Sequence, residues 1–264
     1  MEIFFAGLDW PSLVFLFLLA GFAGFIDSVV GGGGLIQIPA LFATFPGVAP
    51  AILLGTNKIP SISGTSLAML RYASRVKLPW HMLGWAFVST LLFAFLGARV
   101  VSLLPKEWMR PLILVLLVLV AVVTFMRKDF GQHYAPRYFG RREILMGILV
   151  GAVLGFYDGF FGPGMGTFLI FCFVRFFGYD FLLASAVSKV LNWASNFAAL
   201  AYFAPTGHVM WSIAVLMGIA NISGAWVGSH MAISRGAGFI RILFLFVLTA
   251  LIAKLGWDTV RPWL

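Results

Sequence analysis

Charged residues and cysteine are scarce in this sequence. Only 10% of its 264 residues are Asp, Glu, Lys or Arg, against about 25% in an ordinary soluble domain, and 61% are hydrophobic. The single cysteine, Cys172, excludes an intramolecular disulfide and argues against a thiolate metal cluster. His81, His133 and His208 have no metal-ligand spacing to one another or to acidic residues. The composition is not that of a soluble domain, and we expect neither a metal site nor a cofactor.

Basic residues are also absent before the first long apolar run. The segment MEIFFAGLDWPS carries Glu2 and Asp9 but no Lys or Arg, so it lacks the basic head of a cleavable signal peptide and the first helix is expected to stay. Apolar runs of about 20 residues, enough for a helix to cross a ~30 Å hydrocarbon core, recur along the chain. They do not alternate as barrel strands do. The net charge of +9 falls mainly in connectors, so we expect a lipid bilayer and no nucleic acid as partner.

The chain contains an internal repeat. A shift of 131 residues aligns GFIDSVVGGG (24–33) with GFYDGFFGPG (155–164) without a gap, and also pairs Lys58 with Lys189. We therefore divide the chain into a first transmembrane repeat (1–126), a connector (127–142) and a second transmembrane repeat (143–264). The helices expected from the apolar runs are 12–30, 35–46, 50–72, 80–103 and 109–126, and then 143–161, 166–177, 181–203, 210–231 and 239–256.

Charge in the matched connectors predicts how the two repeats are oriented. RYASRVK (71–77) holds three basic residues, whereas its mate YFAPTGH (202–208) holds no Lys or Arg. By the positive-inside rule, 71–77 and the basic connector 127–142 are cytoplasmic and 202–208 lies outside. The predicted fold is an all-α polytopic membrane protein with two inverted repeats and broken or re-entrant helices. Whether 35–46 and 166–177 are re-entrant or complete a broken span is left open.

Four ionisable residues occupy repeat-related positions inside apolar segments: Asp27, Lys58, Asp158 and Lys189. A charge at a helix centre costs roughly 2.5 to 3.5 kcal/mol on insertion scales, so such residues usually face a partner or a watery cavity. One interpretation is a pair of structural salt bridges between helices.

A polar stripe beside the lysines favours a second interpretation. The first repeat has Asn57, Ser61 and Thr65, spaced by four along one helix face, and the second repeat has mates at the same spacing. Small polar residues also hold membrane helices together, but next to a lysine in both repeats they indicate a polar pathway. Those mates are Ser188, Asn192 and Asn196.

The glycine clusters predict two helix breaks. A new helical segment begins after GGGG (31–34) and after GPGMG (162–166), and a helix N-terminus exposes amide groups and the positive end of a dipole. One such terminus from each repeat would form an anion site near the midplane. Close helix packing through small residues is the alternative.

Further candidates lie close to these breaks. Pro60 leaves the carbonyl of Thr56 without its helical donor, so that carbonyl is a candidate ligand. Gln37, whose mate is Phe168, could hydrogen-bond a ligand. Asp27 and Asp158 precede the breaks by about one turn and would repel an anion, so a structural or coupling role is expected for them: holding Lys58 or Lys189, tethering loop amides, or binding a proton.

Three segments together resemble the sulfite exporter TauE/SafE family of membrane transporters. They are GFIDSVVGGGGLIQIPAL, LLGTNKIPSISGT and GFYDGFFGPGMGTF, which lie in both halves of the chain. The second half departs from the pattern at AVSKVLN, where the residues before the lysine differ. The resemblance implies transport of small sulfur-containing anions such as sulfite or organosulfonates, commonly as export across the bacterial inner membrane.

The residues and the resemblance together predict a secondary transporter that works by alternating access at a midplane site between the repeats. An anion channel or uniporter for small oxyanions is the alternative, and a homo-oligomer is left open. Because no nucleophile and base pair is evident, we expect no enzyme activity. The expected substrate-binding residues are Lys58, Lys189, Asn57, Thr56, Gly32, Gly33, Gly34, Gln37, Gly164, Met165, Gly166, Ser188 and Asn192.

Overall fold

The computed structural model describes residues 9–104, 115 and 134–234, and all regular secondary structure in these residues is helical. The predicted helices 109–126 and 239–256 lie outside the described residues. The first half holds α1 (Trp10–Val30), α2 (Gly34–Thr44), α3 (Pro50–Ala73) and α4 (Trp80–Ser102). The second half holds α6 (Arg141–Phe160), α7 (Met165–Cys172), the π-helix η1 (Phe173–Phe177), α8 (Phe181–Phe203) and the helix Trp211–Ser234.

The described helices agree with the predicted ones because glycine, proline and aspartate mark their ends. Gly31 adopts a left-handed conformation (φ 82°) that ends α1, and Asp180 accepts hydrogen bonds from the amides of Leu182 and Leu183 at 2.9 and 3.0 Å to begin α8. The predicted helix 166–177 differs, since it is divided into α7 and η1. Gly178, also left-handed (φ 74°), ends this segment.

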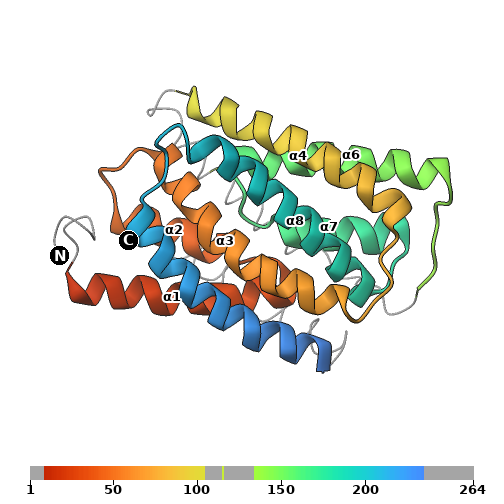
Figure 1. Ribbon diagram of the computed structural model, residues 1–264, viewed down its shortest axis with the longest axis horizontal. Helices are drawn as coiled ribbons and strands as arrows, with labels where there is room; N and C mark the ends of the chain where they lie inside the picture. The colour runs from red at the N-terminus through yellow and green to blue at the C-terminus, as the bar shows by residue number, and fades with distance from the viewer. Residues whose placement is uncertain (1–8, 105–114, 116–133, 235–264) are drawn as a thin grey trace, which may run out of the picture.

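The central helices are α3 and α8, which pack against each other and carry the two lysines (Figure 1). Around them, the halves exchange partners. In the second half, α6 packs against α4 of the first half, with Gly97 facing the carbonyl of Phe156. In the first half, α1 packs against the helix Trp211–Ser234, with Gly228 facing the carbonyl of Phe25. These two glycine contacts map onto each other under the 131-residue shift.

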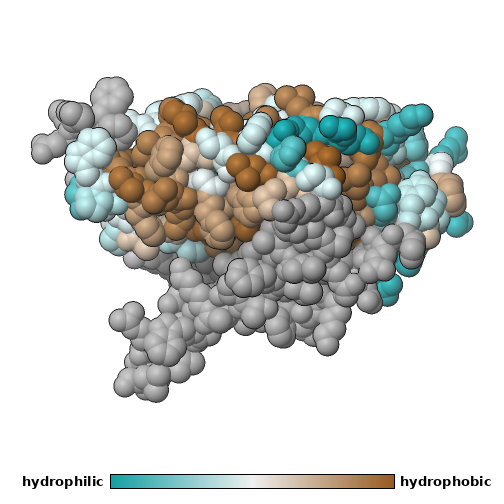
Figure 2. All heavy atoms as spheres, turned by 90° about the horizontal axis from the view of Figure 1, so that it is seen from below, coloured by the Kyte–Doolittle hydropathy of each residue, from teal (hydrophilic) through white to brown (hydrophobic). Residues whose placement is uncertain are grey.

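Four of the described helices are long and apolar enough to cross a membrane: α1, α4, α6 and Trp211–Ser234. Their outward sides carry large apolar residues such as Trp85, Leu92 and Trp226, which are 60%, 61% and 56% exposed. Figure 2 shows broad areas of hydrophobic side chains on one face, with hydrophilic side chains gathered at the right-hand end. Exposed apolar surface on this scale fits contact with lipid. By contrast α2, with 11 residues, is too short to cross a ~30 Å core alone.

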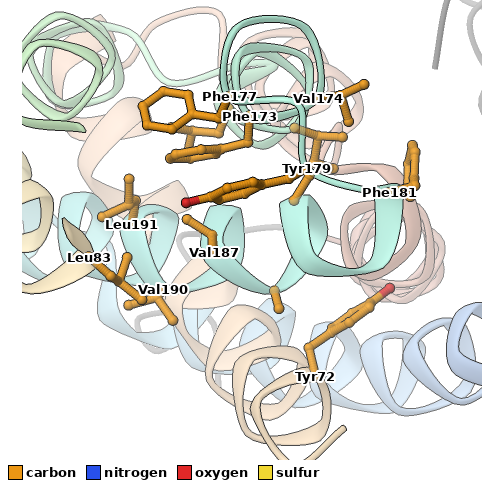
Figure 3. Packing of buried hydrophobic residues seen from close by; sticks show 14 of the residues in the cluster. Tyr72, Leu83, Phe173, Val174, Phe177, Tyr179, Phe181, Val187, Val190 and Leu191 are labelled. Carbon is orange, nitrogen blue, oxygen red and sulfur yellow. The ribbon is translucent and has the colours of Figure 1, made fainter. Parts of the chain in front are cut away.

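An aromatic cluster lies where η1 meets α8. Figure 3 shows Tyr179 beneath the rings of Phe173 and Phe177 and above Val187 of α8, and Tyr179 stacks on Phe173 with ring centroids 5.9 Å apart. Its hydroxyl donates to Glu143 in the first turn of α6 at 2.5 Å, and His81 at the start of α4 contacts the other carboxylate oxygen at 2.7 Å. Burial and the bond to Glu143 raise the pKa of Tyr179, so it remains a donor at neutral pH.

Candidate functional site

The two helix breaks lie against each other at the centre of the molecule. A Cβ added to Gly31 would lie 2.6 Å from the Cα of Gly166, and one added to Gly34 would lie 3.2 Å from the Cα of Pro163. The hydroxyl of Thr167 donates to the carbonyl of Val30 at 3.0 Å, which joins the start of α7 to the end of α1. Glycine at 31 and 166 therefore permits backbone packing that a side chain would prevent, as the alternative interpretation of these glycines requires.

The lysines form ion pairs with the aspartates, and each pair joins the two halves. Lys58 on α3 donates to the carboxylate of Asp158 at 3.1 Å and to its backbone carbonyl at 2.6 Å. Lys189 on α8 donates to the carboxylate of Asp27 at 3.2 Å and to the backbone carbonyl of the same residue. The four formal charges sum to zero, and each lysine closes the end of the helix that precedes a break in the other half.

Asp27 also holds the loop that follows it. Its Oδ1 accepts from the amide of Gly33 at 3.2 Å, and its Oδ2 accepts from Thr65 at 3.4 Å. Of the roles expected for this aspartate, its contacts match both the holding of a lysine and the tethering of a loop amide. Since Gly33 already donates to Asp27, that amide is not free to bind an anion in this conformation.

A small cavity lies between the breaks and the central helices. It encloses ≈ 20 Å³, room for about one water molecule. Nine residues of the predicted set line it: Asp27, Gly34, Asn57, Lys58, Asp158, Gly164, Met165, Gly166 and Asn192.

Four residues that were not in the predicted set also line this cavity. They are Gly31, Ser61, Gly162 and Asn196. The sequence held a signal for each, because Ser61 and Asn196 belong to the polar stripes and Gly31 and Gly162 are repeat mates.

Other predicted residues lie outside the cavity lining. Lys189 lies behind Asp27, and Thr56 faces another helix, where its hydroxyl accepts from the amide of Met210 at 2.9 Å. Gly32, Gly33, Gln37 and Ser188 are also absent from the lining. Tyr157 does not reach the cavity either, because its hydroxyl donates to the carbonyl of Pro163.

Three buried side-chain atoms in the described part of the chain have no hydrogen-bond partner: Asn57 Oδ1, Gln37 Nε2 and Ser188 Oγ. Leaving a buried polar group unpaired costs roughly 1 to 3 kcal/mol, so such groups mark positions where a ligand or water can bind. Of the three residues, Asn57 alone lines the cavity, and its amide nitrogen donates to Ser61 at 3.3 Å.

Known proteins resemble this chain over nearly its whole length. The sulfite exporter TauE/SafE family matches residues 16–255. A probable membrane transporter protein, ORF9 of a Sinorhizobium species, is 37% identical over 260 residues, which covers 97% of this chain and 96% of the relative.

Two further relatives bear similar names. A probable membrane transporter protein of Haemophilus influenzae is 34% identical over 250 residues, covering 93% of this chain and 95% of its own. The probable membrane transporter protein YfcA of Escherichia coli K12 is 34% identical over 247 residues, covering 92% and 89%. No solved structure matches the chain. Together with the four apolar helices, these matches show that the chain belongs to the sulfite exporter TauE/SafE family and is a multi-pass membrane transporter.

Proposed function

We propose that this protein is a secondary transporter of small sulfur-containing anions, such as sulfite or an organosulfonate, which it exports across the bacterial inner membrane. The observation that carries the proposal is the position of Lys58, which lines a central cavity beside the first turn of α7. A lysine ammonium and the free amides of a helix N-terminus together suit the oxygens of a compact anion.

Alternating access fits the arrangement of the two halves, which we propose to be inverted repeats. In Figure 1, α1 and α6 run in opposite directions along the long axis, and so do their partners α3 and α8. The reciprocal pairs Lys58–Asp158 and Lys189–Asp27 exchange under the 131-residue shift. Two related halves around one site can open it alternately to either side.

Substrate binding requires the ion pairs to rearrange. The cavity has room for about one water molecule and is too small for a tetrahedral oxyanion, so this conformation is closed around its centre. In an open conformation the anion replaces the carboxylate of Asp158 as the partner of Lys58. Because a buried lysine without any partner is unfavourable, an empty site returns to the ion pair. This exchange of partners prevents an unloaded open state from persisting.

Transport in proteoliposomes tests the proposal. Labelled sulfite and methanesulfonate should enter with saturating kinetics and show counterflow, whereas methanesulfonamide, the uncharged analogue, should not compete. A channel would pass the anions without counterflow. Competition by the neutral compound equal to that by the sulfonate, or transport of a sugar or a cation in place of the anions, would refute the anion assignment.

Cysteine labelling tests the inverted arrangement separately. Cysteines are introduced at Ser74 and Thr206, which are repeat neighbours at the ends of α3 and α8. In a variant that lacks Cys172, an impermeant maleimide should reach position 206 from the periplasm and position 74 only from the cytoplasm. Labelling of both from the same side would contradict the inverted repeats.

A further inference from the structure

The charged groups that face the cavity are unevenly divided between the two ion pairs. Lys58 and Asp158 both line the cavity, whereas of the second pair only Asp27 does. The side chain of Asp27 is 15% exposed and that of Lys189 only 1%, so the second pair turns its carboxylate toward the cavity and its ammonium away. The lining therefore carries one ammonium and two carboxylates. A bare anion that enters such a site meets a negative wall.

The same side of the cavity has an unsatisfied acceptor. Asn57 is 3% exposed, lines the cavity, and its Oδ1 has no hydrogen-bond partner. Its amide nitrogen lies near the loop that Asp27 tethers, 3.9 Å from the position of a Cβ added to Gly34. A buried acceptor next to a carboxylate is satisfied by a proton donor or by a small cation, and an anion would make it worse. The volume of ≈ 20 Å³ admits one particle of about the size of water.

We propose that the transported anion binds together with one monovalent cation, H⁺ or Na⁺, which is held on the Asp27 and Asn57 side of the cavity. This inference rests on the proposed function and adds the coupling ion to it. A proton on the Asp27 carboxylate and a sodium ion between its oxygens and Asn57 Oδ1 supply the same single positive charge. Either one makes the lining neutral, so that a monoanion binds through Lys58 without repulsion. The anion and the cation then cross the membrane as one neutral load.

The groups around Asp27 restrict where the positive charge binds. Charged and titratable groups face it from three helices: Lys189 on α8, Lys58 and Tyr72 on α3, and Asp158 on α6. Lys189 and Lys58 already donate to carboxylates, and the hydroxyl of Tyr72 donates to the carbonyl of Ser28 at 3.0 Å. Among these groups Asp27 combines a place in the lining with the greatest side-chain exposure of the paired charges, so it is the acceptor that a cation reaches first.

Calorimetry of methanesulfonate binding to the purified protein tests the coupling, because this anion keeps a single charge over the whole pH range used. The titration is repeated between about pH 6 and pH 8.5, in sodium and in choline salts, and proton uptake is followed with an indicator dye in weak buffer. Proton coupling predicts that affinity falls about tenfold per pH unit at high pH, with one proton taken up per anion. Sodium coupling predicts that affinity rises up to about tenfold for each tenfold rise in sodium.

Two matched double variants locate the cation. Asp27→Asn with Lys189→Met removes one buried pair without leaving an unpaired charge, and it makes the lining neutral, so anion binding should persist without dependence on pH or sodium. Asp158→Asn with Lys58→Met removes the other pair and leaves Asp27, so anion binding should fall at least about tenfold, as expected for loss of a charged hydrogen bond.

The outcomes separate this inference from the proposed function. Anion binding by the wild-type protein that is equal in all salts and at all pH values, with no proton uptake, overturns the coupling and leaves the transporter assignment intact. Wild-type pH or sodium dependence retained in Asp27→Asn with Lys189→Met overturns the assigned position. Absence of binding by any sulfur oxyanion overturns the proposed function and this inference with it.

Discussion

The two lysine–aspartate pairs contain the same residue types in equivalent positions, yet they meet different surroundings. The Lys58–Asp158 pair has both members in the cavity lining, with side chains that are each 3% exposed. In the Lys189–Asp27 pair, only the aspartate lines the cavity. Repetition of a sequence thus supplied two ion pairs, and local differences between the halves gave the pairs separate functions in our proposal: one for the anion and one for the cation.

Removal of a single lysine should have the largest effect and test how closely the pairs resemble each other. Lys58→Met leaves Asp158 buried and unpaired, which should destabilise the protein by about 3 to 5 kcal/mol. Lys189→Met should cost less, because Asp27 is more exposed and keeps its bonds from Gly33 and Thr65. Unfolding of the detergent-solubilised variants, followed by tryptophan fluorescence, measures both.

The partner of each lysine serves as the control for this measurement. Adding Asp158→Asn to Lys58→Met should restore most of the lost stability without restoring transport, whereas adding Asp27→Asn to Lys58→Met should restore none. If Asp27→Asn is the change that rescues Lys58→Met, the pairing described here is wrong.

The helix breaks offer a second comparison between neighbouring glycines. Gly31→Ala puts a Cβ into a left-handed position (φ 82°) and against the backbone of Gly166, so we expect a loss of about 2 to 4 kcal/mol. Gly32→Ala is the matched control, since the nearest atom to an added Cβ there is 3.8 Å away. Thermal unfolding and expression level distinguish the two. Equal tolerance of both substitutions would show that the breaks do not pack as closely as described.

The ends of the molecule differ at three repeat-related positions, and Tyr179→Phe tests that difference. Glu143, His81 and Tyr179 contact one another, but their mates are Ser12, Ser212 and Val48, none of them ionisable at neutral pH. Loss of the bond from Tyr179 to Glu143 should cost about 1.5 to 3 kcal/mol.

The pH dependence of this contact has a defined sign. Because the pKa of Tyr179 is raised above the ordinary value of 10.0 in the folded protein, its contribution to stability is complete below pH 10 and decreases as the pH rises further. Tyr179→Phe should therefore flatten the stability profile in this alkaline range. A profile identical to that of the wild type would contradict the buried donor.

The smallest effect is expected at the repeat mates Asn57 and Ser188. Ser188→Ala removes a hydroxyl that has no partner, so it should change stability by less than about 1 kcal/mol and leave transport near the wild-type rate. Asn57→Ala should also be mild for stability but should slow transport about tenfold, because Asn57 lines the cavity. Initial uptake rates at saturating anion measure the contrast. Comparable loss in both variants would remove the asymmetry between the halves.

Helix positions could be predicted from the sequence more fully than contacts between helices. Glycine, proline and aspartate mark the helix ends chemically, so α1, α3 and α8 agree with the predicted ranges. The partners of the lysines could not be deduced, because repeat-related positions allow Asp27 to meet either lysine with equal sense. The bond between Tyr179 and Glu143 joins residues 36 apart in sequence, and no local pattern indicates it. The polar stripe did indicate Ser61 and Asn196, although only the structure shows that they reach the cavity.

The exchange of helices between the halves has a consequence for biosynthesis. Lys58 leaves the ribosome 100 residues before Asp158, and Asp27 leaves it 162 residues before Lys189. At a translation rate of roughly 5 to 20 residues per second, each early charge waits about 5 to 30 seconds for its partner. During that time neither α1 nor α4 has the helix that covers it, so the nascent first half enters the membrane with unmet charge and uncovered glycine faces. Assembly of the interior is therefore a late event that begins only when the second half arrives, and a chain stopped after α4 leaves both early charges without their partners.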